Sequence, residues 1–477
     1  MDTELIVDFK NIHDNIHGYI SISNFAYFII NSEEFQRLRK IKQLGTCVYA
    51  FPNAYHNRFV HSIGTYYLAS RLINCIVKNT LVGTIDEYLK SITELQDYYH
   101  RQYNGEVYLL DEYVCELIKI AALCHDLGHG PFSHVFDYID DSHEERSKLL
   151  LENIIKKNST LSNVIKKQDI EFMKNLISPK EKNQGFIFQI ISNSFNGLDV
   201  DKFDYIARDS YVLGINSGFD HSGLVDHVKI IDNNIVYPER VCYEIKKMYE
   251  TRYSLHKQIY NHKSVISSQL MIVELLKILD PILGLSNIGK DMDKFCKLTD
   301  DYIFSCVDSM LPLYMELSLY DPKYFEKVNI LKDAEKIIKR INNHRMYKFI
   351  GYCIADCNID LTMKDFENIE TFDSNYSNQI IIFQTKIGFV SGNKKNPLDN
   401  IYTYSTSSFD NIKSQCIKAN KISIHDISLI TPKVYQEYIT MIFSKSENQD
   451  EWLNIHKWTE EIFRLKKKVV NITHIKL

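Results

Sequence analysis

Three features are missing from this sequence, and each absence argues against a class of protein. None of the ten cysteines forms a CxxC pair, which argues against a zinc finger or a thioredoxin-like redox site. No stretch reaches the roughly 18 apolar residues that a transmembrane helix needs. The first residues contain no basic segment followed by an apolar run, so we expect no signal peptide. The sequence therefore predicts a soluble intracellular protein with reduced cysteines and no membrane partner.

A surplus of positive charge is also missing. The chain carries 56 basic and 61 acidic side chains, a net charge of -5, so a generally basic nucleic-acid-binding surface is not expected. A local basic patch is still possible. Nucleic acid is therefore a possible partner, although nothing in the sequence indicates it. No internal repeat or long low-complexity tract is present, which argues against a solenoid. The composition, with 45% hydrophobic and 25% charged residues, is that of an ordinary soluble enzyme.

Apolar residues recur at helical spacing through most of the chain. This periodicity predicts helices over about 61–77, 112–138, 143–157, 168–177, 198–212 and 243–279. Gly128, Gly130 and Pro131 interrupt the second of these helices. Short apolar patches around Gly18 predict one hairpin, and two alternating runs within residues 227–237 predict another.

The pattern changes near residue 345. Beyond it we predict strands over 379–390 and 400–405 and helices over 432–444 and 450–467. The predicted fold class is mainly α, with a helical body over residues 1–345 and a smaller C-terminal α+β lobe over residues 346–477. A chain of this length has room for two or three domains, or for one large helical domain and a smaller one.

The strongest chemical signal lies between Leu123 and His134. Four side chains that can bind a metal or move a proton, His125, Asp126, His129 and His134, stand within ten residues of an otherwise apolar predicted helix. Such groups are costly to desolvate unless they have partners. A His-Asp pair alone is weak evidence, because hydrogen-bonded core histidines are common. The prediction of a metal site therefore depends on finding further ligands elsewhere.

Two other segments offer those ligands. Residues 57–64 place His61 at the start of a predicted helix, and residues 197–209 place acidic, basic and aromatic side chains together on another. A divalent transition-metal ion prefers one or more imidazoles combined with carboxylates. The three segments can supply that set if the fold brings them together.

These segments resemble the H…HD…D signature of the HD superfamily of phosphohydrolases. More narrowly, they resemble the SAM-and-HD-domain deoxynucleoside triphosphate (dNTP) triphosphohydrolases and their bacterial dGTP-hydrolysing relatives. The matching strings are residues 56–62, 125–134, 199–205, 255–263 and 396–399. The resemblance covers most of the chain, without the SAM domain, and implies a helical HD core over about residues 45–215. It also implies hydrolysis of dNTPs to deoxynucleoside and inorganic triphosphate.

Carried over position by position, the resemblance implies four metal ligands: His61, His125, Asp126 and Asp201. This mixed set suits one divalent transition metal, and Fe, Mn and Zn all stay open. A magnesium ion on the triphosphate is a second expected cofactor.

The resemblance also implies the reaction. Water or hydroxide attacks the α-phosphorus with help from the metal, and the 5′-oxygen leaves. The leaving alkoxide needs a proton, which a histidine near its natural pKa can supply. We assign that role to His134, oriented by Asp137 three residues later, and place His129 against the phosphate. His143, followed by Glu144, is a second candidate acid or base.

Nine positions match the family's substrate contacts: Gln43, Arg58, Lys202, Tyr205, Asp209, Arg252, His256, Tyr260 and Asn261. The basic residues among them are expected to bind the phosphates, whereas Tyr205 and Asp209 match sugar-side contacts. Gln43 is expected to read the sugar 3′-hydroxyl. Tyr260 is expected to crowd the 2′ position and thereby exclude ribonucleotides. Asn261 stands where relatives often have glutamine, so the base preference stays open.

The resemblance further implies a homo-oligomer, a dimer or a tetramer, with a nucleotide activator at the subunit interface. Lys10, Gln36 and Arg39 match the activator-binding positions. The remaining positions depart from the pattern: Asn31, Gly223, Phe409 and Asp410. Because arginines are lost there, we predict weak or absent activation by a dGTP-type nucleotide, or a different activator.

Two other functions remain open. The first is another HD phosphohydrolase, acting on nucleoside monophosphates or cyclic nucleotides. The second is an inactive module that binds nucleotides or nucleic acid. Tyr260 and the phosphate-binding set Lys202 and Arg252 favour triphosphates over the first, and intact metal ligands argue against the second.

Overall fold

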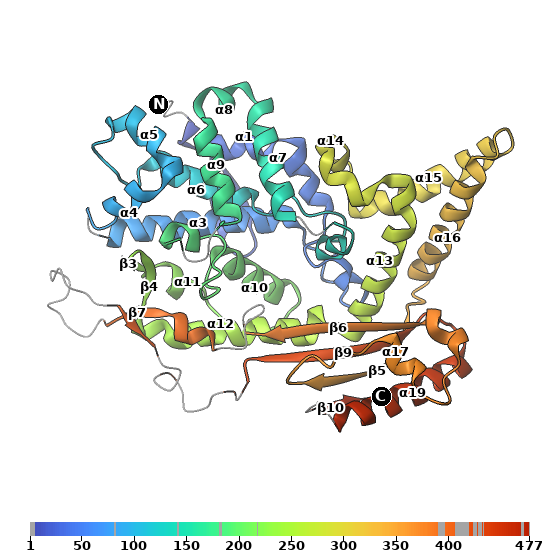
Figure 1. Cartoon of the computed structure of the whole chain (residues 1–477). Helices are drawn as coiled ribbons and strands as arrows, with labels where there is room; N and C mark the ends of the chain where they lie inside the picture. Colours follow the sequence, from blue (N-terminus) through green and yellow to red (C-terminus); the bar gives the residue numbers. More distant parts are fainter. Residues whose placement is uncertain are drawn as a thin grey trace.

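The computed structural model describes residues 5–80, 83–140, 143–180, 184–216, 218–389, 396–405, 419–422, 427, 432, 434–468 and 472–476. The fold is mainly helical, as predicted, and its strands form three small sheets within these segments (Figure 1).

The chain begins with the predicted hairpin. Strands β1 (Asp8–Asp14) and β2 (Gly18–Ser23) pair antiparallel, and Gly18 has a φ of 73° that suits a glycine at the turn. Ser23 ends the hairpin and caps the helix that follows, α1 (Asn24–Ile30), by accepting from the amide of Ala26. A short helix α2 (Glu33–Gln36) and two 3₁₀ turns, Arg37–Lys40 and Gly45–Tyr49, lead into the helical body.

Three buried helices form the centre of the body: α3 (Arg58–Asn79), α6 (Glu112–Cys124) and α10 (Val200–Val212). Each begins at a residue whose side chain accepts from the helix's third amide, namely Asn57, Asp111 and Asp199. Helix α3 packs against both α6 and α10. The candidate ligand segments lie at the ends of these helices, so helix termini set the position of the site.

The predicted helix over 112–138 is shorter than expected. Helix α6 ends at Cys124, and the segment after it forms turns before a 3₁₀ helix, Ser133–Tyr138. Phe132 and Ser133 have φ values of 61° and 57°, in the left-handed region. The histidine-rich segment is therefore a sharply folded connection and not one face of a regular helix.

Further helices surround this centre. They are α4 (Asp86–Ser91), α5 (Thr93–Tyr103), α7 (His143–Lys157), α8 (Ser159–Val164), α9 (Lys167–Ile177), the 3₁₀ helix Phe186–Gln189 and α11 (Ser222–Val225). The bounds of α7 and α9 agree with the predicted helices 143–157 and 168–177 within one residue.

The second half of the body contains the predicted hairpin of β3 (Lys229–Ile231) and β4 (Asn234–Pro238). The long helix predicted over 243–279 is divided into α12 (Cys242–Leu255), a π-helical turn (His256–Tyr260) and α13 (Lys263–Leu283). The interruption matters because π turns often occur at functional sites. Helices α14 (Met292–Phe295), α15 (Asp300–Ser318) and α16 (Tyr324–Asn342) follow, and the last two form a projecting hairpin (Figure 1).

The C-terminal part is built on a four-stranded sheet of order β10-β5-β9-β6. Its strands are β5 (Lys348–Ala355), β6 (Ile380–Gly388), β9 (Gln436–Ser444) and β10 (Ile472–Lys476), and helices α17 (Met363–Glu367) and α19 (Gln449–Lys467) accompany them. Strand β7 (Tyr402–Tyr404) instead pairs parallel with β4 of the body, and β8 (Asn420–Lys421) pairs with β7.

One predicted element is wrong in type. The helix expected over 432–444 is strand β9, which pairs antiparallel with β5 on one side and β6 on the other. Its segment from Ile439 to Phe443, apolar except for Thr440, is compatible with either a buried helix or a buried strand. Hydrogen bonding to two neighbouring strands decides between them, and both neighbours are distant in sequence.

Candidate active site

The fold brings all four predicted metal ligands together. His61 Nε2 lies 3.2 Å from Asp201 Oδ1 and 3.4 Å from Asp126 Oδ2. His125 Nε2 lies 3.4 Å from Asp126 Oδ1 and 3.6 Å from Asp201 Oδ1. Two imidazoles and two carboxylates, from the starts of α3 and α10 and the end of α6, therefore converge on one point.

These residues fit a divalent cation. The Nε2 atoms of His61 and His125 are buried and make no hydrogen bond to any part of the chain that the structure describes. Orphaned buried nitrogens that face carboxylates are expected where a positive ion completes the site. Both Nδ1 atoms are engaged, that of His61 by Asp204 Oδ2 at 2.7 Å and that of His125 by the carbonyl of Ala122 at 2.8 Å. Each imidazole thus directs its Nε2 towards the ion position.

Neighbouring charged groups shift the pKa values of the candidate ligands. Burial opposes ionisation of Asp126, but the Arg58 guanidinium and nearby imidazoles outweigh it and hold its pKa well below the usual range. Burial likewise raises the pKa of Asp201, and His125 and His61 reverse this to a net lowering. Burial alone would lower the pKa of His61, but the neighbouring carboxylates of Asp201, Asp204 and Asp126 raise it to about 10. Both carboxylates are therefore held in the ionised form that a metal ion binds.

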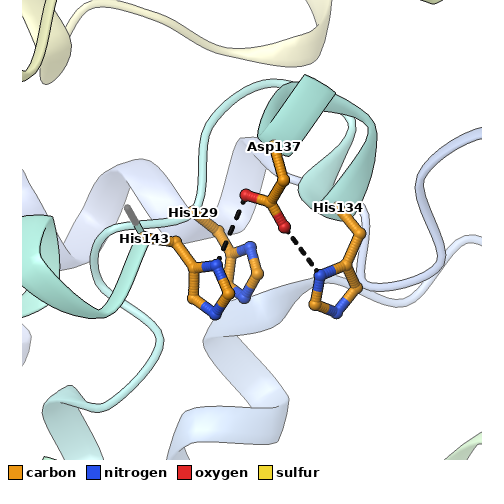
Figure 2. Close-up of side chains that lie close together, drawn as sticks. All are labelled: His129, His134, Asp137 and His143. Atoms are coloured by element: carbon orange, nitrogen blue, oxygen red, sulfur yellow. Dashed lines mark hydrogen bonds and ion pairs between the residues drawn. The ribbon is translucent and has the colours of Figure 1, made fainter. Parts of the chain in front are cut away.

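A second cluster joins three imidazoles to one carboxylate (Figure 2). Asp137 lies between His134, with Nδ1 at 3.0 Å from Oδ2, and His143, with Nδ1 at 3.3 Å from Oδ1. The ring of His129 stacks on that of His143 with centroids 4.2 Å apart. His129 Nε2 also lies 3.3 Å from Asp126 Oδ1, which links this cluster to the first.

The histidines of this cluster differ in their preferred charge. Burial and the Arg58 guanidinium lower the pKa of His129 well below its usual value, so its ring is neutral. Burial also lowers the pKa of His143, but Asp137 and Glu144 raise it to a net value above the ordinary 6.5. Asp137 itself has a lowered pKa because its hydrogen bonds to imidazoles outweigh burial. The side chain of His134 is 71% exposed, which leaves it free to face a substrate.

Both clusters open onto one cavity of about 580 Å³, a size within the usual range for ligand pockets. All of the predicted site residues line it except His61 and Asp137, which support the lining residues from behind. The lining predicted from the sequence consists of Gln43, Arg58, His125, Asp126, His129, His134, His143, Asp201, Lys202, Tyr205, Asp209, Arg252, His256, Tyr260 and Asn261.

The substrate-side residues are held by specific contacts. The Tyr260 hydroxyl donates to Asp209 Oδ2 at 2.5 Å, and His56 Nε2 lies 2.7 Å from Asp209 Oδ1. Lys202 donates to Asp199 Oδ2 at 2.7 Å, whereas Arg252 donates to the carbonyl of Gly388 at 2.8 Å. These contacts keep the aromatic and cationic groups ordered along the cavity wall.

Several functional candidates were not predicted. Asp204 received no role, although it lies three residues after Asp201 and contacts His61. Gln269, Thr385 and Lys386 line the cavity from α13 and β6. Helical spacing could have indicated Asp204, but the residues on α13 and β6 reach the site only through the tertiary fold.

The predicted activator positions that the structure describes lie outside the lining of this cavity. The Arg39 guanidinium lies 3.5 Å from the ring centre of Phe59 and donates to Gln36 Oε1 at 2.9 Å. Lys10 lies over the ring of Tyr27 at 5.5 Å. Phe409 and Asp410 lie outside the described residues.

The helical core with its paired His/Asp groups is that expected of an HD-domain protein, and comparison with known proteins agrees. A family profile described as HD domain matches residues 102–199. The chain is therefore an HD-domain hydrolase whose His/Asp groups could hold a divalent metal.

Whole-chain relatives narrow this class. HD domain-containing protein L394 of Acanthamoeba polyphaga mimivirus is 39% identical over 83% of this chain and 85% of its own length. The deoxynucleoside triphosphate triphosphohydrolase SAMHD1 homolog of Dictyostelium discoideum is 31% identical over 93% of this chain and 78% of its own. Deoxynucleoside triphosphate triphosphohydrolase SAMHD1 of Homo sapiens is 29% identical over 91% and 70%. The chain belongs to the HD-domain family that includes the SAMHD1 triphosphohydrolases.

Among the residues that the structure describes, no helix combines the length and the apolar character needed to span a bilayer. The cysteines in the same segments are all free.

Proposed function

We propose that this protein is a metal-dependent dNTP triphosphohydrolase that releases deoxynucleoside and inorganic triphosphate. The observation that carries the proposal is the convergence of a candidate metal centre, an imidazole–carboxylate cluster and a cationic wall on one cavity. The names of its relatives support the substrate class, since several are deoxynucleoside triphosphate triphosphohydrolases.

The candidate ligands are His61, His125, Asp126 and Asp201. A divalent Fe, Mn or Zn ion bound there would polarise the α-phosphate and lower the pKa of the attacking water, with Mg²⁺ accompanying the triphosphate. The chain's own part is to fix the ligands, and it does so through the Nδ1 contacts of both imidazoles. Arg58, which contacts Asp126, places a guanidinium beside the position where phosphate charge would lie.

The second cluster is suited to moving the proton. As the water oxygen bonds to the α-phosphorus, the bond from phosphorus to O5′ breaks, and O5′ takes a proton. His134 is the proposed donor, because it is exposed to the cavity and held by Asp137 at 3.0 Å. Neutral His129 is placed to accept a hydrogen bond from the water or donate one to a phosphate oxygen. His143, whose pKa is raised, is the alternative acid.

The cavity wall is suited to a deoxynucleoside triphosphate. Lys202 and Arg252 supply positive charge for the phosphates, and Lys386 adds a further cation from β6. The ring of Tyr260, tied to Asp209, would occupy the space that a ribose 2′-hydroxyl needs. The side-chain amide of Asn261 donates to the carbonyl of His256 at 2.9 Å, so one of its hydrogen-bonding groups is already used by the backbone. The base preference therefore stays open.

We also expect a homo-oligomer, dimer or tetramer, in line with the resemblance. The expected activator is a nucleotide at the subunit interface, with the weak dGTP-type response that the altered positions predict.

The decisive experiment is product analysis. The purified chain would be incubated with each dNTP and with GTP in Mn²⁺ or Mg²⁺, and inorganic triphosphate measured by ion chromatography. Asp126→Ala, checked for folding by circular dichroism, is the control, because it removes a candidate ligand and leaves the cationic wall. We expect triphosphate from dNTPs with the wild-type chain and at least about 100-fold less with the variant.

Other outcomes point to the remaining functions. If no dNTP yields triphosphate, even with GTP or dGTP added as activator, the proposal fails. Nucleoside monophosphates and cyclic nucleotides would then be screened as substrates of a different HD phosphohydrolase. Nucleotide binding without any turnover would indicate an inactive binding module.

A further inference from the structure

The turn of the N-terminal hairpin reaches the rear of the candidate metal centre. His17, on the turn between β1 and β2, places Nε2 2.7 Å from Asp204 Oδ1. The side chains of His17 and Asp204 are 1% and 0% exposed. Asp204 lies 187 residues further along the chain, on α10, and its other oxygen contacts His61 Nδ1 at 2.7 Å. A surface hairpin is therefore joined to a candidate metal ligand through one buried carboxylate.

Asp204 is held from every side. Arg208 donates to both of its oxygens, from Nε and Nη2, at 2.9 Å each. The same guanidinium donates from Nη1 to Asp14 Oδ2 at 2.8 Å, and Asp14 stands at the other end of the hairpin turn. Asp14 Oδ1 in turn accepts from the amides of Ile16 and His17. Both ends of the turn are thus bonded to α10 through charged or polar groups.

The close approach of α10 to α3 depends on a glycine. Gly64 lies one turn after His61 on α3, and a Cβ atom there would collide with the carboxylate of Asp204 and the guanidinium of Arg208. The side-chain network therefore occupies space that only a glycine leaves open. This packing is independent of the hydrogen bonds and fixes the carboxylate against α3.

The consequence concerns the tautomer of His61. Arg208 donates to both oxygens of Asp204, the paired contact that a guanidinium makes with a carboxylate, and a carboxylate can only accept hydrogen bonds. His61 must then donate from Nδ1, so that its neutral ring, the form that binds a metal, has the lone pair on Nε2, which faces Asp126 and Asp201. The orientation of a ligand imidazole is fixed in this way wherever its second nitrogen is bonded.

We propose that His17 is a positioning residue of the metal centre, which acts through Asp204 to set the orientation and tautomer of His61. The hairpin turn is then part of the support of the site, although it contributes no group to the cavity. The inference rests on the proposed function only in taking His61 as a metal ligand. Loss of an outer partner of this kind lowers metal affinity by about 10- to 100-fold.

Metal affinity tests this directly. The full-length chain would be stripped with a chelator and titrated with Mn²⁺ by isothermal titration calorimetry, in four forms: wild type, His17→Phe, His17→Gln and His13→Ala. Phenylalanine keeps a ring and loses the donor, whereas glutamine loses the ring and keeps an N–H at a similar reach. His13 is an exposed residue on the same hairpin and serves as the matched control. Circular dichroism and the thermal midpoint would establish that each variant is folded.

We expect about 10-fold weaker Mn²⁺ binding for His17→Phe, near wild-type binding for His17→Gln and no change for His13→Ala. Excess Mn²⁺ should restore most of the kcat of His17→Phe, because the defect lies in holding the ion. Mn²⁺ affinity of His17→Phe equal to that of the wild type would overturn the proposal, as would His17→Gln as weak as His17→Phe. The Mn²⁺ titrations contain no nucleotide and do not depend on catalysis. If the wild-type chain released no triphosphate, the proposed function would be refuted, but the Mn²⁺ affinities of the four forms would still test the role of His17.

Discussion

Histidines in this site differ in role because of the partner at Nδ1. His61 and His125 give Nδ1 to Asp204 and to a backbone carbonyl, and their Nε2 atoms face carboxylates. His134 and His143 instead direct Nδ1 towards Asp137, and for His143 this contact raises the pKa. The residue type alone does not distinguish a candidate metal ligand from a candidate acid, whereas the acceptor at Nδ1 does.

This difference predicts a pH effect. The pKa of His143 lies above its ordinary 6.5 because Asp137 outweighs burial, so the protonated imidazole persists to higher pH. In Asp137→Asn that support is lost, the pKa falls, and the alkaline limb of the kcat/KM profile should move down by about one pH unit. Glu145→Gln, an exposed neighbour paired with Lys148, should leave the profile in place. An unchanged alkaline limb in Asp137→Asn would show that this cluster does not supply the proton.

Tyr260 is expected to determine the preference for deoxyribose over ribose. Tyr260→Ala removes the ring that is proposed to exclude the 2′-hydroxyl, so the ratio of kcat/KM for dGTP over GTP should fall by about 10-fold or more, which corresponds to about 1.4 kcal/mol. Tyr260→Phe keeps the ring and loses only the bond to Asp209, and it should retain most of the discrimination. Equal discrimination by the wild type and Tyr260→Ala would remove this residue from substrate selection.

At the level of secondary structure, the ends of three helices determine where the candidate ligands lie. Asn57 and Asp199 cap α3 and α10, and the candidate ligands His61 and Asp201 lie within the first turns that follow. Helix α6 ends immediately before His125. Groups at a helix terminus can converge on one point from three directions, which groups along one helix face cannot do.

The turn after α6 depends on a close approach that can be tested. A Cβ on Gly128 would collide with the carbonyl of His143 and come within 2.5 Å of the amide nitrogen of Ser147, at the start of α7. Gly128→Ala should therefore push α7 away and lower the free energy of unfolding by about 1–3 kcal/mol. Gly223→Ala is the matched control, because its nearest neighbour, Val241 Cγ1, lies 3.6 Å from the added atom. Urea denaturation would measure both, and equal stability of the two variants would contradict the expectation.

Across the whole molecule, the cavity is completed by distant parts of the chain. Residues of the HD segment form one wall, α12 and α13 with the intervening π turn form another, and Phe383, Thr385 and Lys386 of β6 close it. Arg252 is tied to β6 through the carbonyl of Gly388. The C-terminal sheet is therefore part of the cavity wall.

Activation by a nucleotide would also involve the whole molecule, because the activator is expected between subunits. Asn31 and Gly223 replace charged groups expected at the activator positions, so nucleotide activation should be weak. Adding GTP or dGTP should change the rate of dTTP hydrolysis by less than about 3-fold, and light scattering should show the same oligomer with and without it. A strong rise in rate or a change in mass on adding GTP would mean that other residues bind the activator.

The sequence by itself determined the helical character of the chain, the family resemblance and the residues expected at the site. Local periodicity and helix caps are short-range properties, which is why α7 and α9 were located within one residue. The candidate ligands were recognisable because a motif combines residue type with spacing.

Only the tertiary structure decided the rest. The pattern of β9 fits a buried helix and a buried strand equally well, and pairing with β5 and β6 makes it a strand. The role of His17 could not be foreseen, since its partner Asp204 lies 187 residues away. Hydrogen bonds and charge pairing between distant segments depend on how helices pack, and that packing is fixed by the whole chain and not by any local pattern.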